Sequence, residues 1–191
     1  LRITDMKSGS TASDYISIVR SLAPLVTKHR QSFVRERCLP VPVYAALAEA
    51  GLFRLWLPRS QGGPQLSPLE FLAIVEEAAA LDGSVGWLVG NGAGMSRVAG
   101  YLDPIVSREI FEDPMAFVVS GTMPNGVATP CDGGHLVSGR WTFGSGSNHA
   151  TWFMGRCRMA DTDGGNPHIA CYFSALEVEI IDTWHVSGLK A

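Results

Sequence analysis

The sequence predicts an α+β fold, in which an all-helical N-terminal part is followed by an antiparallel, β-barrel-like part. Before about Asp113, apolar residues recur at three- and four-residue steps, which is the period of amphipathic helices. From Phe117 onward, short runs rich in β-branched and aromatic residues alternate with glycine-containing turns. Helices that come first and strands that come second favour two segregated lobes. We expect domains at 1–114 and 115–191.

Apolar spacing and capping residues place the helices. Ser67, Pro68 and Glu70 form a strong helix start, with an N-cap serine, a proline in the first turn and a glutamate that completes a capping box. Asp82-Gly83 ends that helix. We expect helices over about 13–37, 42–51, 67–81, 85–102 and 103–112, and an extended apolar segment over 52–58.

The expected helix over 85–102 is unusually rich in glycine. Each internal glycine weakens an isolated helix by up to about 1 kcal/mol. The pattern is therefore expected where another element, or a ligand, must come close, and we favour close packing. The glycines are Gly86, Gly90, Gly92, Gly94 and Gly100.

The second part is expected to be strands and turns. Phe117-Val118-Val119 begins the first strand, and Asp132-Gly133-Gly134 is typical of a hairpin turn. We expect a turn at Pro124-Asn125-Gly126 and a polar loop over 161–167. Further strands are expected over 150–159, 168–173 and 178–182.

One stretch, from Gly139 to Trp152, stands out as a candidate binding element. Val137, Trp141 and Phe143 alternate with polar residues, which is the period of a half-buried strand. The strand is expected to break into a loop, Gly144 to Asn148, that offers hydroxyl groups and accessible backbone N–H groups. An aromatic wall beside such a loop suits a flat heteroaromatic ligand. The alternative is an ordinary barrel strand with its turn.

Composition excludes several classes of protein. The 191 residues are 46% hydrophobic, and a net charge of −3 without a Lys/Arg cluster gives no footprint for nucleic acid. No apolar run approaches the roughly 18 residues of a membrane span, and the first residues lack the pattern of a signal peptide. We therefore expect a cytoplasmic protein without nucleic-acid or membrane partners. Four scattered cysteines, without a C-x-x-C pair, indicate neither zinc nor disulfides.

From about Ser13 to its end, the chain resembles the N-terminal and middle portions of the acyl-CoA dehydrogenase superfamily. Aligned on Gly139, the residues Phe143 to Gly146 fall where dehydrogenase members carry Trp-Ile-Thr-Asn. The run Phe-x-Ser-Gly-x-x-His-Ala-x-Trp, which starts at Phe143, is more similar to the hydroxylase-type branch, the flavin-dependent monooxygenases. The tail from Trp184 to Lys190 resembles that branch too.

The resemblance implies a flavin site. Phe143 would flank the isoalloxazine and Ser145 would donate a hydrogen bond near flavin N5, while Thr122 and Ser120 would hold the pyrimidine edge. In the corresponding flavin loop, Met123 replaces the glutamate of the family, and Ala128 stands where a pyrophosphate-binding serine is expected. The cofactor is therefore expected to be FAD, with FMN as the alternative. No metal is expected.

The reaction stays open between two chemistries. An acyl-CoA dehydrogenase would oxidise a CH–CH bond of an acyl thioester and pass electrons to a carrier protein, whereas a two-component monooxygenase would take reduced flavin from a flavin reductase. We place the dehydrogenase first, because hydroxylase-type relatives carry a histidine in the helix after Gly86-Trp87 and this chain has none. A non-catalytic flavin-binding or scaffold protein is the alternative of another class.

The resemblance also implies that one domain of the family is missing from this sequence. The catalytic glutamate of the dehydrogenases lies in a C-terminal helical bundle, which is expected to be absent here, so no catalytic residue is assigned. With that bundle, the protein is expected to form a homo-oligomer, a tetramer, that acts on a small-molecule substrate such as an acyl-CoA.

Overall fold

The computed structural model describes residues 10–160 and 167–191. They form two compact units. The helical unit runs to Phe117 and also includes Ile181–Ala191, and the sheet unit is Val118–Ile180. Helices come first and a sheet follows, so the predicted α+β class is confirmed. The polar loop expected over 161–167 lies almost wholly outside the described residues.

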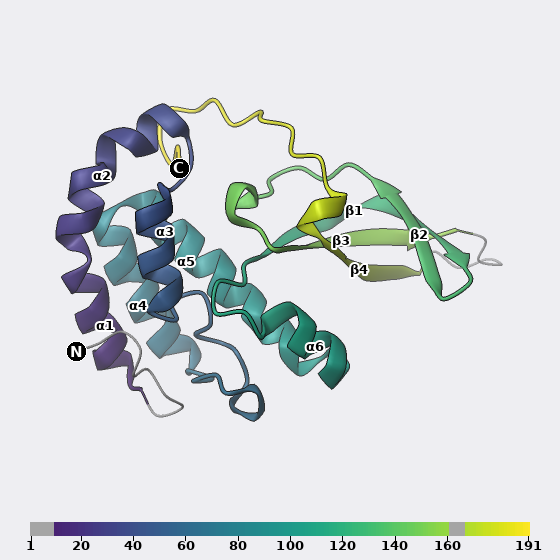
Figure 1. Ribbon diagram of the computed structural model, residues 1–191, viewed down its shortest axis with the longest axis horizontal. Coiled ribbons are helices and arrows are strands. Elements are labelled where there is room, and N and C mark those ends of the chain that lie inside the picture. Colours follow the sequence, from purple (N-terminus) through teal and green to yellow (C-terminus); the bar gives the residue numbers. More distant parts are fainter. Residues whose placement is uncertain (1–9, 161–166) are drawn as a thin grey trace. The chain divides into compact units, whose positions relative to one another are not determined.

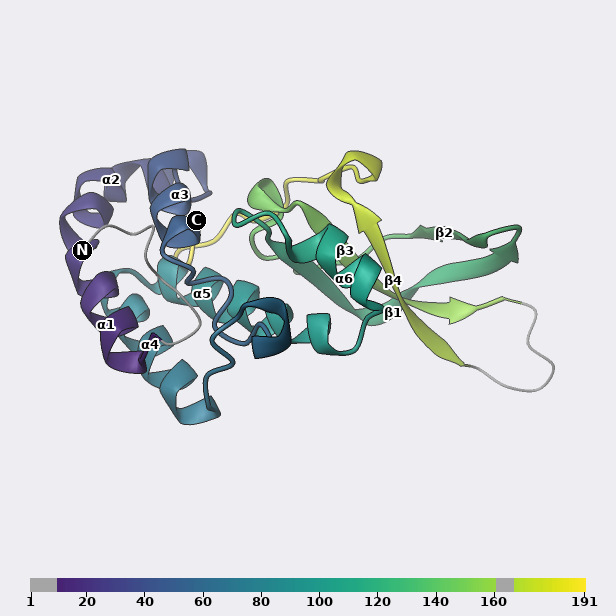
Figure 2. The same cartoon turned by 60° about the horizontal axis from the view of Figure 1, so that its bottom comes forward.

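The helical unit contains six α-helices and two short 3₁₀ segments among its described residues (Figures 1 and 2). Four of the helices have the places that the sequence predicts. The elements are α1 (Ala12–Ser21), α2 (Ala23–Glu36), α3 (Val41–Glu49), η2 (Arg59–Gln61), α4 (Pro68–Leu81), α5 (Gly83–Ser96), η3 (Arg97–Gly100) and α6 (Pro104–Phe111).

The single helix expected over 13–37 is wrong, because the chain breaks between α1 and α2. Leu22 ends α1, and its N–H still donates to the Ile18 carbonyl at 3.2 Å. Pro24 follows in the first turn of α2. Proline has no N–H to continue the ladder and is tolerated only in a first turn, so a new helix begins there.

The extended segment expected over 52–58 is also wrong. The chain instead makes consecutive turns, in which Arg54 N–H donates to the Gly51 carbonyl at 3.0 Å and Leu57 N–H to the Arg54 carbonyl at 2.9 Å. The apolar residues of this segment are nevertheless buried, because the turns point them inward. They are Leu52, Phe53, Leu55 and Leu57.

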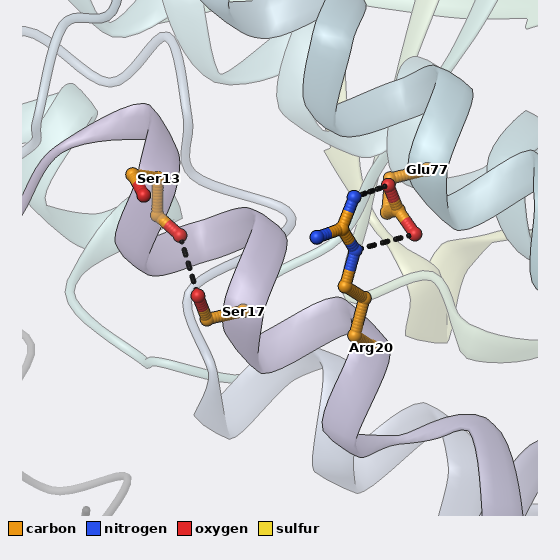
Figure 3. Close-up of polar contacts among 4 residues, drawn as sticks. All are labelled: Ser13, Ser17, Arg20 and Glu77. Atoms are coloured by element: carbon orange, nitrogen blue, oxygen red, sulfur yellow. Dashed lines mark hydrogen bonds and ion pairs between the residues drawn. The ribbon is translucent and has the colours of Figure 1, made fainter.

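Helix α4 begins as the sequence predicts. The Ser67 N–H donates to the Glu70 carboxylate at 2.8 Å, and the Glu70 N–H donates to Ser67 Oγ at 3.4 Å, which completes the capping box. Farther along α4, the Glu77 carboxylate accepts two hydrogen bonds from Arg20 of α1, at 3.0 and 2.9 Å (Figure 3). This bidentate contact lowers the pKa of Glu77 and raises the pKa of Arg20. It links α1 to α4 on the surface.

The glycines of α5 allow close packing, as we expected. A Cβ atom at Gly86 would lie 2.4 Å from the Ala79 Cβ of α4, so the two helices meet there at backbone distance. A Cβ atom at Gly92 would lie 2.7 Å from Phe117 and 2.9 Å from Phe53. These two rings meet edge to face with centroids 5.0 Å apart. Close packing therefore explains both positions without a ligand.

The last residues of the chain belong to the helical unit. Arg37, at the end of α2, forms an ion pair with Asp182. The Ala191 N–H donates to Ser84 Oγ at 3.2 Å, at the start of α5. The strand expected over 178–182 is therefore wrong: the chain leaves the sheet through the 3₁₀ turn η5 (Ala175–Glu177) and then crosses to the helical unit.

The sheet unit holds four described strands in the order β2-β1-β3-β4. Adjacent pairs are antiparallel except β1 and β3, which run parallel, so the sheet is mixed. The predicted hairpin is confirmed, with Gly133 at φ 82° in its turn. The turn expected at Pro124-Asn125-Gly126 is instead a register shift inside β1. The strands are β1 (Val118–Cys131), β2 (Gly134–Gly139), β3 (Trp152–Met159) and β4 (His168–Ser174).

Two alanine substitutions in α5 separate packing from helix propensity. We expect Gly92→Ala to lower the free energy of unfolding by about 1–3 kcal/mol, because the new methyl group overlaps two buried rings. Gly90→Ala is the matched control, since its methyl group would meet Val75 at an ordinary 3.7 Å. That change should raise the stability by up to about 1 kcal/mol through helix propensity. Urea unfolding measures both, and equal effects would contradict the packing argument.

Candidate functional site

The four residues predicted to bind a cofactor all lie in the sheet unit. Ser120 and Thr122 are two residues apart on β1, where alternation sends both side chains to the same face. Ser120 is half-buried and Thr122 is exposed. Phe143 and Ser145 lie in the connection between β2 and β3, outside any strand. Phe143 is 79% exposed, whereas Ser145 is half-buried.

The strand expected to run through Trp141 and Phe143 is wrong, because β2 ends at Gly139. Beyond it, Trp141 turns back over the sheet and its indole N–H donates to the Arg156 carbonyl of β3 at 3.1 Å. Phe143 adopts a left-handed φ of 60°, which a strand residue does not. The alternation of Trp141 and Phe143 with polar residues therefore does not mark a strand: Trp141 lies over the sheet and Phe143 lies in a loop.

Trp141 lies in a nest of four glycines. A Cβ atom at any of them would come within 2.4–2.7 Å of the indole ring, so each glycine is needed for the ring to lie against the backbone. The ring of Phe173 covers Trp141 from β4, with centroids 5.6 Å apart. The four glycines come from three strands: Gly121 and Gly126 of β1, Gly139 of β2 and Gly155 of β3.

The loop after Trp141 is a chain of tight turns. Ser145 N–H donates to the Phe143 carbonyl at 2.9 Å, and Ser147 N–H donates to the Gly144 carbonyl at 3.1 Å. The 3₁₀ helix η4 (Ser147–His149) then leads into β3. A Cβ atom at Gly144 would lie 3.5 Å from Val119 Cγ1, so the loop rests on the Val119 face of β1, which strand alternation places opposite to the face of Ser120 and Thr122.

The side chains predicted to bind a cofactor offer groups that suit a flat, polar heteroaromatic ligand. Phe143 offers an exposed ring, and the hydroxyl groups of Ser120, Thr122 and Ser145 offer hydrogen bonds to the edge of a ligand. The contact of Gly144 with Val119 brings the loop of Phe143 and Ser145 to β1, the strand that carries Ser120 and Thr122 on its other face. Each pair offers groups whose chemistry suits an isoalloxazine ring, and that all four residues hold one ring stays a prediction.

Other chemistries find less support in the sheet unit. Burial, and the neighbouring Cys171, raise the pKa of Cys157 to about 11, so this thiol is protonated at neutral pH and is a poor nucleophile. Within residues 10–160 and 167–191, no cluster of three or more His, Cys, Asp or Glu side chains could hold a metal ion. Over the same residues, no helix has the length and apolarity to cross a membrane.

The sequence did not reveal a hollow on the sheet beside Thr122. It measures about 360 Å³ and is lined by residues of β1, β3 and β4. Arg156 contributes a guanidinium group to it, and His168 contributes an imidazole. Only the pairing of β3 with β4 brings these two residues together. The lining residues are Thr122, Met154, Arg156, His168, Ile169 and Ala170.

The glycine nest can be tested at Gly155. We expect Gly155→Ala to displace Trp141, because the new methyl group would lie 2.6 Å from the indole ring. The free energy of unfolding should fall by about 1–3 kcal/mol, and the near-ultraviolet circular dichroism of Trp141 should weaken. Gly134→Ala is the matched control, because a Cβ atom at this strand position meets nothing within 4 Å. A Gly155→Ala protein with unchanged spectrum and stability would contradict the nest.

Comparison with known families supports the resemblance seen in the sequence. Residues 17–102 match the N-terminal domain of acyl-CoA dehydrogenases. The chain is 34% identical over 147 residues to a pigment production hydroxylase of Rhodococcus erythropolis. That match covers 73% of this chain and 37% of the hydroxylase. It is 31% identical over 183 residues to HsaA of Mycobacterium tuberculosis, the oxygenase subunit of a flavin-dependent monooxygenase. That match covers 94% of this chain and 46% of HsaA.

Solved structures share the fold of both units. The crystal structure of the M. tuberculosis HsaA monooxygenase matches with a TM-score of 0.84 at 30% identity, over 95% of this chain and 48% of that one. XiaF from Streptomyces sp., in complex with FADH2 and glycerol, matches with a TM-score of 0.87 at 26% identity, over 94% of this chain and 46% of that one. The chain thus spans less than half the length of these proteins. The predicted resemblance to the acyl-CoA dehydrogenase superfamily, and to its flavin-dependent monooxygenase branch, is therefore confirmed.

Proposed function

We propose that this chain is part of a flavin-dependent enzyme, the oxygenase component of a two-component monooxygenase. The observation that carries the proposal is the similarity to HsaA, which extends over 94% of the chain and so includes both units. Other relatives are a resorcinol hydroxylase, a p-hydroxyphenylacetate 3-hydroxylase and an indole-3-acetate monooxygenase. Their named substrates are all aromatic. We therefore place the monooxygenase before the acyl-CoA dehydrogenase, which reverses the order expected from the sequence.

The proposed roles of the site residues follow from their chemistry. Phe143 would pack against the flavin ring, and Ser145 would donate a hydrogen bond near N5. Ser120 and Thr122 would bind the pyrimidine edge from the adjacent strand. When bound, reduced flavin (FAD or FMN) supplies the electrons with which dioxygen is split into a hydroxyl group on the substrate and water. The sheet unit would hold and orient the cofactor for that chemistry.

The partners follow from the same proposal. The protein would receive reduced flavin from a flavin reductase and bind a small aromatic substrate. The chain spans less than half of HsaA. We propose that the protein acts as a homo-oligomer.

A dehydrogenase is the second candidate, and one observation favours it. Hydroxylase-type relatives carry a histidine in the helix that follows Gly86-Trp87, and α5 has none. The polar residues found there serve their own helix: Asn91 donates to the Trp87 carbonyl at 2.7 Å, and the buried Ser96 hydroxyl donates to the Ala93 carbonyl at 2.7 Å. Both hydrogen bonds lie within α5. A flavin-binding protein without turnover is the third candidate.

The electron source distinguishes the candidates. The protein with reduced FMN or FAD, an aromatic substrate and ¹⁸O-labelled dioxygen should incorporate the label into a hydroxylated product. A dehydrogenase would instead let an acyl thioester bleach bound oxidised flavin under anaerobic conditions, without any need for oxygen. Label in the product supports our proposal, and anaerobic bleaching by the thioester contradicts it. Flavin binding with neither reaction would indicate the non-catalytic protein.

Substitution in the loop tests the site itself. We expect Ser145→Ala to weaken the binding of reduced flavin about tenfold, because one hydrogen bond of about 1.4 kcal/mol is lost. Ser147→Ala is the matched control, since it removes a hydroxyl from the same loop and leaves the backbone bond from Ser147 N–H to the Gly144 carbonyl intact. Anaerobic fluorescence titration measures both constants. Equal losses in the two variants would remove Ser145 from the proposed site.

A further inference from the structure

Two of the four cysteines meet on one face of the sheet unit. All four are free thiols, and Cys157 of β3 is buried, whereas Cys171 of β4 is half-buried. In the register of β3 with β4, Cys171 lies directly opposite Gly155. Cys157 follows Gly155 by two residues, so strand alternation places both thiols on the same face of the sheet. The two cysteines are therefore diagonal neighbours on adjacent strands.

The two thiols are in contact, and they lie beside Trp141. A hydrogen bond joins the thiol groups of Cys157 and Cys171. A Cβ atom at Gly126 would lie 2.5 Å from Cys157 Sγ and 2.4 Å from the indole ring, so the thiol and the ring both pack on this glycine. A chemical change at Cys157 Sγ therefore alters the surroundings of Trp141.

The two thiols differ in their access to a reagent. Cys157 has no exposed surface, and burial together with the neighbouring Cys171 raises its pKa to about 11. Cys171 is half-buried, so a small oxidant can reach its sulfur from solvent. The more accessible thiol reacts first, and a buried thiol in contact with it can then complete a disulfide. This order assigns the first step to Cys171.

We propose that Cys157 and Cys171 form a reversible disulfide when the protein meets hydrogen peroxide. The Cys171 sulfur attacks one peroxide oxygen, the O–O bond breaks, and one water leaves, which produces a sulfenic acid. The Cys157 sulfur then attacks the Cys171 sulfur, the S–O bond breaks, and a second water leaves with the thiol proton. The two thiols lose two electrons in total, and the peroxide is reduced to two waters.

The diagonal placement predicts that this disulfide is easily reduced. Diagonal neighbours on adjacent strands lie about 7–8 Å apart, whereas the Cα atoms of a relaxed disulfide are usually about 5.5–6 Å apart. Closing the bond therefore requires a backbone shift and leaves strain in the bridge. Among the described strands β4 is at an edge of the sheet, so it is held on one side and can shift. Strained disulfides are the labile ones, and we expect a switch rather than a permanent crosslink.

Counting free thiols tests the pair. The protein is treated with a stoichiometric amount of hydrogen peroxide at neutral pH, and the thiols that remain are alkylated and counted. The count should fall from four to two, and reduced glutathione should restore it to four. Trypsin cuts after Arg158 and so separates the two cysteines. The resulting peptides should stay linked until the sample is reduced.

Two variants separate this pair from general oxidation. Cys171→Ser should keep its three remaining thiols under the same treatment and yield no linked peptides. Cys131→Ser is the matched control, because it removes an exposed thiol at the end of β1 and should still lose two thiols. The linked peptides of the wild type need no variant, so they test the pair even if Cys171→Ser does not fold.

Tryptophan fluorescence provides a second readout. A disulfide quenches the fluorescence of an indole that it touches. Oxidised wild type should therefore lose part of its emission through Trp141, and reduced glutathione should restore it. Cys171→Ser should keep its emission under the same treatment, which accounts for peroxide damage elsewhere in the chain.

The possible outcomes decide the inference. A thiol count that stays at four, or that falls by two in Cys171→Ser as well, would overturn it. Linked peptides that contain Cys38 or Cys131 in place of this pair would overturn it too. A Cys157–Cys171 disulfide that glutathione leaves intact would be a permanent crosslink and would contradict the reversible site. No flavin enters these measurements, so their failure would leave the proposed function standing.

Discussion

The sheet unit depends on the packing of Trp141 against four glycines. The indole ring replaces the side chains that these glycines lack, and its N–H is satisfied by the Arg156 carbonyl. Because the glycines come from β1, β2 and β3, one side chain holds three strands together. The same packing fixes where the chain goes after β2, and thus where the loop from Phe143 to Ser147 rests on β1. The position of the loop that carries Phe143 and Ser145 is a consequence of this packing.

In the helical unit, too, glycines allow other elements to pack directly against the backbone. Gly86 and Gly92 let α4 and the Phe53 and Phe117 rings approach the backbone of α5. Tyr44 extends this aromatic cluster, since its ring stacks on Phe53 at 5.2 Å and its hydroxyl donates to the Met115 carbonyl at 2.7 Å. Burial raises the pKa of Tyr44 to about 12, so the hydroxyl stays protonated as a donor. Phe117 stands immediately before β1, and the cluster therefore anchors the end of the helical unit.

The residues that stabilise the fold are buried, and the residues proposed to bind the cofactor are not. The nest and the aromatic cluster are buried, whereas the groups proposed to meet the cofactor are exposed or half-buried: Thr122, Phe143, Ser120 and Ser145. An aromatic ring that is 79% exposed is costly in water unless something covers it.

The sequence by itself determined the fold class, most helix starts and the family resemblance. The capping box of Ser67 and Glu70, the hairpin glycine Gly133 and the shift from helical to strand periodicity are local signals, because residues close in the chain produce them. Only the tertiary structure decided the rest. The sequence predicts Trp141 to be a strand residue, whereas its packing against glycines distant in sequence places it over the sheet. Arg156 and His168 come together only through the register of β3 with β4. Such contacts arise from packing between distant segments, which no periodicity encodes.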